Sequence, residues 1–110
     1  MAFPGIGELA ESMMAAAKGS LGDDWGKAKT FAKPEFSRLA RSVVDIGKLT
    51  ANGEISAAEA KALIAIHKNT TRTVLLTVQG LGLLAVEKAV NAALGSVKDA
   101  VNGAVGVALL

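Results

Sequence analysis

The sequence contains no cysteine, so neither disulfides nor thiolate metal sites are available to the chain. Aromatic residues make up only 4% of it, and all of them, Phe3, Trp25, Phe31 and Phe36, lie in the first third. The single histidine, His67, has no cysteine or carboxylate at a ligand spacing. We therefore expect neither catalysis nor metal binding at this histidine.

The chain also has little excess of positive over negative charge, with 12 basic and 10 acidic residues. The net charge is +2, which is too small by itself to indicate a polyanionic partner such as nucleic acid. The N-terminus has no basic region, and Glu8 and Glu11 interrupt the segment where the apolar core of a signal peptide would run. We therefore expect no cleavable secretion signal and a location in the cytoplasm or within a larger assembly, with membrane association as the alternative.

The C-terminal half lacks a hydrophobic run long enough for a conventional membrane span. Its longest uncharged run, residues 73–86, would reach about 21 Å as a helix, against a hydrocarbon core of about 30 Å. Hydrophobic residues nevertheless make up 51% of the chain and charged residues 20%. Such a composition is too apolar for a disordered chain, so we expect one folded domain over residues 1–110.

Apolar residues recur at helical spacing and predict an all-α fold. A short helix over residues 1–22 precedes a second helical region over 23–50, in which Pro34 kinks or restarts the helix. From 56 to 110 no proline appears, which predicts a long Ala/Val/Leu-rich helix, continuous or bent near 69–82. The helices are expected to form a helical hairpin that oligomerises.

The stretch LTANGEISAAEA, residues 49–60, connects these two helical regions. Aligned on Gly53, it matches part of an EF-hand calcium loop, with Glu59 at the position of the bidentate ligand. Lys48 falls at the first ligand position, where its charge would repel a metal, so we expect no metal and no other cofactor. Ser56 and Glu59 instead have the spacing of a helix-capping box, and the Asn-Gly pair favours a turn.

One apolar stripe follows the C-terminal region at steps of three or four residues. It consists of Val86, Val90, Leu94, Val97, Val101, Val105 and Leu109. A straight helix over 56–110 would be about 80 Å long, whereas a compact chain of this size has a radius of gyration of about 13 Å. We therefore expect other copies of the chain, or lipid, to cover the stripe, unless a sharp break produces a compact bundle.

Small and basic residues suggest two further contacts. Alanines at spacing four allow close helix packing, and these are Ala85, Ala89, Ala93, Ala100 and Ala104. Basic residues of the second helical region fit an anionic surface such as lipid headgroups, and these are Lys33, Arg38, Arg41 and Lys48. Acidic neighbours dilute this basic face, so we do not expect nucleic acid as a partner, and a solvated helix face is the simpler interpretation.

No arrangement of hydroxyl, histidine and carboxylate, and no complete glycine-rich phosphate motif, indicates an enzyme. We predict a non-enzymatic structural or assembly protein that self-associates through its C-terminal helix, such as a component of a shell, a virion or a secretion apparatus. The alternative is a membrane-embedded or membrane-active helical protein, such as a small pore or a holin-like factor. The expected partners are accordingly other copies of the chain or a lipid bilayer.

Overall fold

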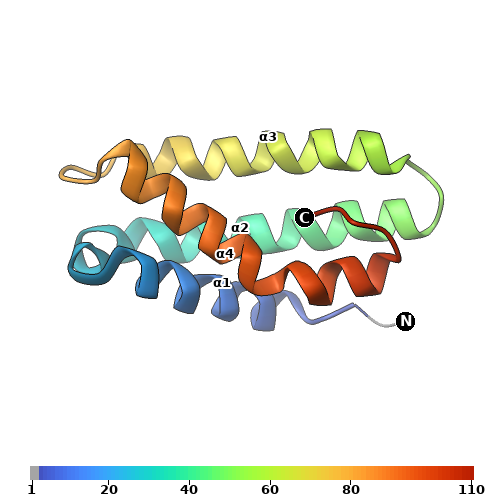
Figure 1. Cartoon of the computed structure of the whole chain (residues 1–110), viewed down its shortest axis with the longest axis horizontal. Helices are drawn as coiled ribbons and strands as arrows, with labels where there is room; N and C mark the ends of the chain where they lie inside the picture. Colours follow the sequence, from blue (N-terminus) through green and yellow to red (C-terminus); the bar gives the residue numbers. More distant parts are fainter. Residues whose placement is uncertain (1–2) are drawn as a thin grey trace.

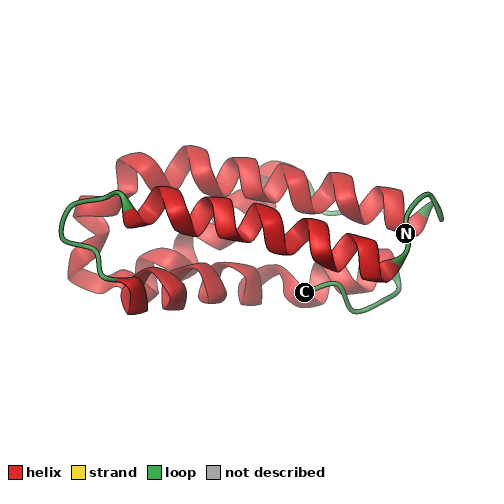
Figure 2. Cartoon of the chain, turned by 90° about the horizontal axis from the view of Figure 1, so that it is seen from above, coloured by secondary structure: helices red, strands yellow, loops and turns green. Residues whose placement is uncertain are grey.

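The structure, a computed structural model, describes residues 3–110, which form a bundle of helices (Figure 1). Its elements are α1 (Ile6–Leu21), the short 3-10 helix η1 (Gly22–Asp24), α2 (Trp25–Ala51), α3 (Ala57–Leu76) and α4 (Leu83–Val105). Successive α-helices run in opposite directions. No strand occurs among the described residues (Figure 2), so the prediction of an all-α fold is confirmed.

The connection between α3 and α4 reverses the chain. Gly80 has a φ of 91°, a left-handed conformation that a residue without a side chain adopts at little cost. Val78 and Leu81 of the same turn are buried and belong to the core, so this connection is anchored in the bundle. The expectation of one long helix over 56–110, continuous or bent near 69–82, is therefore wrong, because the chain reverses at 77–82 and the alternative of a sharp break produces a compact bundle.

Most of the second helical region is one helix. Pro34 lies inside α2, which continues from Trp25 to Ala51, so of the two alternatives, a kink or a restart at this proline, the restart is wrong and the kink stays a prediction. Proline has no N–H to donate, and the ring crowds the preceding turn. Because Pro34 is exposed, the carbonyl group left without its helical partner lies on the side of α2 that water can reach.

The four helices do not contact one another equally. α1 packs against both α2 and α4, and α2 packs against α3, whereas α3 touches α4 much less extensively than it touches α2. The bundle measures 42 × 22 × 18 Å, with a radius of gyration of 13.6 Å. Figure 1 shows α3 at one edge of the bundle.

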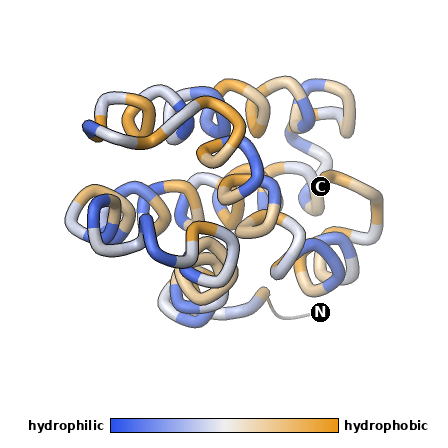
Figure 3. Tube along the Cα trace, turned by 60° about the vertical axis from the view of Figure 1, so that its left-hand side comes forward, coloured by the Kyte–Doolittle hydropathy of each residue, from blue (hydrophilic) through white to orange (hydrophobic). Residues whose placement is uncertain are grey.

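All four helices contribute to the main core. Its largest fully buried side chains include Met13, Phe36, Leu39, Val43, Leu75, Val86, Val90, Val97 and Val101. Hydrophobic and hydrophilic residues alternate along each helix (Figure 3), as expected for helices with one buried face. A second, smaller buried cluster joins α2, α3 and the C-terminal segment.

Candidate functional site

The apolar stripe of the C-terminal region lies inside the bundle. Val86, Val90, Val97 and Val101 are completely or almost completely buried against the chain's own helices, and Leu94 is nearly so. The expectation that the rest of the chain could not cover this stripe is wrong, because the turn before α4 places that helix against α1 and α2. The four valines are therefore not free to contact another copy or lipid while the bundle is intact, whereas Leu94 reaches the lining of a surface groove.

The stripe also ends earlier than its spacing predicted. α4 ends at Val105, which is half-buried, and the last residues fold back over the bundle (Figure 1). The Asn102 side chain holds this segment, because its Oδ1 accepts hydrogen bonds from the N–H groups of Leu109 (2.8 Å) and Leu110 (3.0 Å). Leu109 is buried in the second cluster beside Ile64 of α3. The continuation of the helix to Leu109 is thus wrong, although this leucine is buried.

The alanines predicted to allow close packing occupy different environments. Ala89 and Ala93 are fully buried within the bundle, Ala85 and Ala104 are half-buried, and Ala100 is exposed. Close approach of α4 to its own neighbours therefore accounts for the two buried positions.

Of the four basic residues predicted to meet an anionic surface, one forms an ion pair with a neighbour and three do not pair within the described part of the chain. Arg38 forms an ion pair within α2 and donates a hydrogen bond to Thr71 of α3 (3.3 Å). Lys33, Arg41 and Lys48 are exposed and form no ion pair within residues 3–110. Arg38 therefore links two helices, and only the other three remain available to an anionic surface.

The corner between α2 and α3 is a structural turn. The Oγ of Ser56 accepts from the N–H of Glu59 (3.1 Å), and the Oε1 of Glu59 accepts from the N–H of Ser56 (3.1 Å). Hydrogen bonding to the Glu59 carboxylate, first from the backbone N–H of Ser56 and then from the Ser56 side chain, lowers the pKa of Glu59. Within residues 3–110 no group of three or more His, Asp or Glu residues could hold a metal ion.

The end of the bundle formed by the α3–α4 turn carries an exposed apolar surface. Leu76 at the end of α3 and Leu83 and Leu84 at the start of α4 are 37%, 55% and 65% exposed. We call this surface the apolar end. All three leucines leave a large part of their side-chain area in water.

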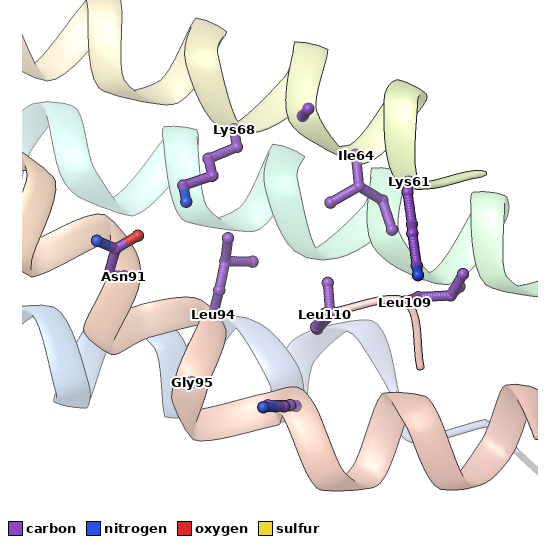
Figure 4. A pocket seen from close by; sticks show the side chains of 10 residues that line it. Lys61, Ile64, Lys68, Asn91, Leu94, Gly95, Leu109 and Leu110 are labelled. Carbon is purple, nitrogen blue, oxygen red and sulfur yellow. The ribbon is translucent and has the colours of Figure 1, made fainter. Parts of the chain in front are cut away.

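A groove lies between α3, α4 and the C-terminal segment, with a volume of about 330 Å³. Its apolar lining comes from Ile64, Leu94, Leu109 and Leu110, as Figure 4 shows. Three lysines also line it, namely Lys61 and Lys68 of α3 and Lys98 of α4. We call this feature the α3–α4 groove, and it combines an apolar floor with a cationic rim.

The groove continues along α3 and α4 toward the apolar end. Lys68 and Asn91 line both this continuation and the part that Ile64 and Leu94 line. Arg72 and Glu87 line the continuation only. Arg72 Nη1 lies 2.9 Å from Glu87 Oε1, so an ion pair crosses the groove here. The carboxylate of Glu87 is neutralised in this way and does not offset the charge of the three lysines.

Neither the groove nor the apolar end was predicted from the sequence. Lys61 and Lys68 stand seven residues apart, which places them on one face of a helix, but the contribution of Lys98 depends on how α4 returns. The adjacent Leu83 and Leu84 follow a glycine at the start of a helix. The glycine before the two leucines could have indicated this start, but the prediction of a longer helix placed all three residues in its interior.

Comparisons of this chain with protein families, with curated proteins and with solved structures find no match. None of the helices within residues 3–110 is long enough and apolar enough to cross a membrane.

Proposed function

We propose that this chain is a non-enzymatic helical protein that self-associates, and that its copies meet through the apolar end of the bundle. The observation that supports this proposal is the exposure of the adjacent Leu83 and Leu84, which leave 55% and 65% of their surface in water, while Leu76 at the end of α3 is 37% exposed. Contiguous apolar surface on a folded chain commonly marks an interaction site. The contact proposed here replaces the buried stripe of α4 as the surface for assembly.

The charges around the apolar end favour a second copy over an anionic membrane. Leu83 and Leu84 are followed four residues later, on the same helix face, by Glu87 and Lys88. Glu87 is already paired with Arg72 of α3. A surface that carries both signs can meet itself across a twofold axis with opposite charges facing, whereas an anionic bilayer selects an excess of cations.

The energy available from this contact is of the order that a weak dimer requires. Burying an exposed leucine side chain is worth about 1.5–3 kcal/mol. Four such leucines, two from each copy and each 55% or 65% exposed at the start, would contribute about 4–7 kcal/mol if fully buried. Association costs an estimated 4–15 kcal/mol in lost freedom. The two terms are of similar size, so we expect a weak contact whose population rises with protein concentration.

Sedimentation velocity at rising micromolar concentration tests this proposal. We expect the wild type to sediment as a dimer or a larger species and the Leu83→Glu/Leu84→Glu variant to sediment as a monomer. Both new carboxylates lie in the first turn of α4, where the helix dipole favours anions, so the variant should retain its helical circular dichroism. The matched control is Leu63→Glu/Ile66→Glu, which changes exposed apolar residues on α3 by the same charge.

Three results would contradict the proposal. The wild type could sediment as a monomer at every concentration. The control variant could dissociate as completely as the Leu83/Leu84 variant, which would place the contact elsewhere. The wild type could be monomeric in solution yet pellet with anionic vesicles, which would favour a membrane-associated protein instead.

A further inference from the structure

The inner lining of the α3–α4 groove is apolar, and it is formed by the edges of the core residues Ile64, Leu94 and Leu109, which are 5%, 8% and 6% exposed. Ile64 of α3 and Leu94 of α4 face the groove from opposite sides, and Leu109 closes one end (Figure 4). Small residues, Ala65 and Gly95, occupy the lining between the larger ones. The weak contact between α3 and α4 accounts for the opening, because the two helices meet mainly through α2 and the C-terminal segment.

The rim of this groove concentrates unpaired positive charge. Lys61, Lys68 and Lys98 all line it, and no Asp or Glu side chain lines the same part. Within residues 3–110 none of the three ammonium groups lies within ion-pair distance of a carboxylate. Figure 4 shows Lys61 and Lys68 reaching from α3 across the groove. Three like charges around one apolar opening repel one another, and a bound anion would relieve that repulsion.

We propose that the α3–α4 groove binds an anionic amphiphile, a small molecule with one carboxylate or phosphate-type headgroup and one alkyl chain of medium length. The lysines bind the headgroup and the apolar floor covers the chain. Asn91 can donate a further hydrogen bond from its amide at the rim. The part of the groove that Ile64 and Leu94 line has a volume of about 330 Å³, which is within the range for small-molecule sites.

The chemistry of the groove argues against other ligands of similar size. A cation would be repelled by three lysines, and a neutral hydrocarbon would leave those lysines without a counter-ion. An inorganic anion would use the rim but would leave the apolar lining of the groove uncovered. An anion joined to an alkyl chain satisfies both parts of the groove at once.

Decanoate, used below its micelle concentration, is the probe for this proposal. We expect titration calorimetry to detect its binding to the full chain, and we expect amide resonances of groove residues to shift on titration. Decanol has the same chain without the charge, and inorganic phosphate has charge without a chain. Each of these two should bind at least about tenfold more weakly than decanoate, because each lacks one half of the interaction.

Two variants test the location of the site. Gly95→Leu should abolish decanoate binding, because a Cβ at Gly95 meets no atom within 4 Å and the new side chain extends into the groove. Gly103→Leu is its matched control, since a Cβ at this position of α4 also meets no atom within 4 Å and lies outside the groove lining. The control should bind decanoate as the wild type does.

Charge is tested separately. Lys68→Gln/Lys98→Gln should weaken decanoate binding by about tenfold or more, since two charge-assisted contacts are lost. Lys33→Gln/Lys48→Gln makes the same change in net charge on exposed residues of α2 and should leave the affinity unchanged.

Several outcomes would overturn the proposal. These are the absence of decanoate binding, equal binding of decanol, equal loss in the Gly95 and Gly103 variants, or binding to anionic vesicles without binding of monomeric decanoate. None of them depends on whether the chain self-associates, because the substitutions at the apolar end lie outside the lining of this part of the groove.

Discussion

Arg38 of α2 donates a hydrogen bond from Nη2 to the Oγ1 of Thr71 on α3, over 3.3 Å. Within residues 3–110, Thr71 is the only polar side chain that is buried, and it is completely so. The same guanidinium group is held by Glu35, whose Oε1 lies 2.6 Å away. A charged side chain at the edge of the bundle thus satisfies a hydroxyl group in its interior.

This contact should couple α2 to α3 energetically. Arg38→Met leaves the buried hydroxyl of Thr71 without its partner and should lower the free energy of unfolding by about 1–3 kcal/mol. Thr71→Val removes the hydroxyl group itself and should cost less. Denaturant unfolding of the two single variants and the double variant checks this, and the double variant should be more stable than the sum of the single losses implies. Strict additivity would show that the two side chains are not coupled.

Arg41→Met is the control for this prediction. It lies at an exposed position of the same helix and should change stability by no more than about 0.5 kcal/mol.

Gly47 of α2 leaves room for two other segments of the chain. A Cβ at this position would lie 2.8 Å from Phe3 Cε1 and 3.1 Å from Val105 Cγ2. Alanine favours a helix over glycine by about 1 kcal/mol, but overpacking costs about 1–3 kcal/mol. We expect Gly47→Ala to lower the melting temperature, because the crowding exceeds the gain in helix propensity.

Two further variants separate crowding from helix propensity at Gly47. Phe3→Ala should remove most of the additional loss caused by Gly47→Ala, since the closest contact disappears. Gly26→Ala on the same helix meets no atom within 4 Å and should raise the melting temperature. A stabilised Gly47→Ala protein would show that the Phe3 ring moves aside at little cost.

Asn102 should control the C-terminal segment. Its side chain accepts two backbone hydrogen bonds from this segment, and Leu109 completes the cluster with Ile46, Ala60 and Ile64. Asn102→Ala should therefore lower the free energy of unfolding by about 1–3 kcal/mol, because these backbone groups lose their partner. Hydrogen exchange at the amides of Leu109 and Leu110 should become fast in this variant. Protection equal to that of the wild type would mean that side-chain burial alone holds the segment.

The capping box at the start of α3 should be visible in stability measurements. Ser56→Ala removes the acceptor for the N–H of Glu59 and should cost about 1 kcal/mol. Calcium should not change the melting temperature, and a calcium-dependent rise that Glu59→Gln abolishes would contradict this.

Glu59 should also contribute a pH dependence with a definite sign. Hydrogen bonds from Ser56 lower the pKa of this carboxyl group from its ordinary value of 4.5. Its contribution to stability is therefore present above that ordinary value and is lost as the pH falls through the lowered pKa of the folded state. Thermal unfolding between about pH 5 and pH 3 should show this loss in the wild type and less of it in Glu59→Gln. Equal pH profiles would show that the carboxylate is not bonded in this way in solution.

Local chemistry was sufficient for the helices and for one of their corners. Apolar residues at steps of three and four predicted an all-α chain, and the spacing of Ser56 and Glu59 predicted the box that begins α3. Such features depend on residues within one or two turns of each other, so they can be read directly from the sequence. The buried character of the stripe from Val86 to Val101 was also evident, since helical periodicity identifies the apolar face.

Which surface covers that face was decided by the tertiary structure. The turn at 77–82, with Gly80 in a left-handed conformation, sends α4 back along α1. The chain's own helices therefore bury the stripe for which the sequence predicted a partner. The α3–α4 groove and the pairing of Arg38 with Thr71 arise in the same way, because each joins residues from helices that are distant in sequence. Periodicity specifies the direction in which side chains point around one helix axis. The relative placement of two axes depends on a few backbone angles in the turn and on the packing of every side chain between them, which no local pattern contains.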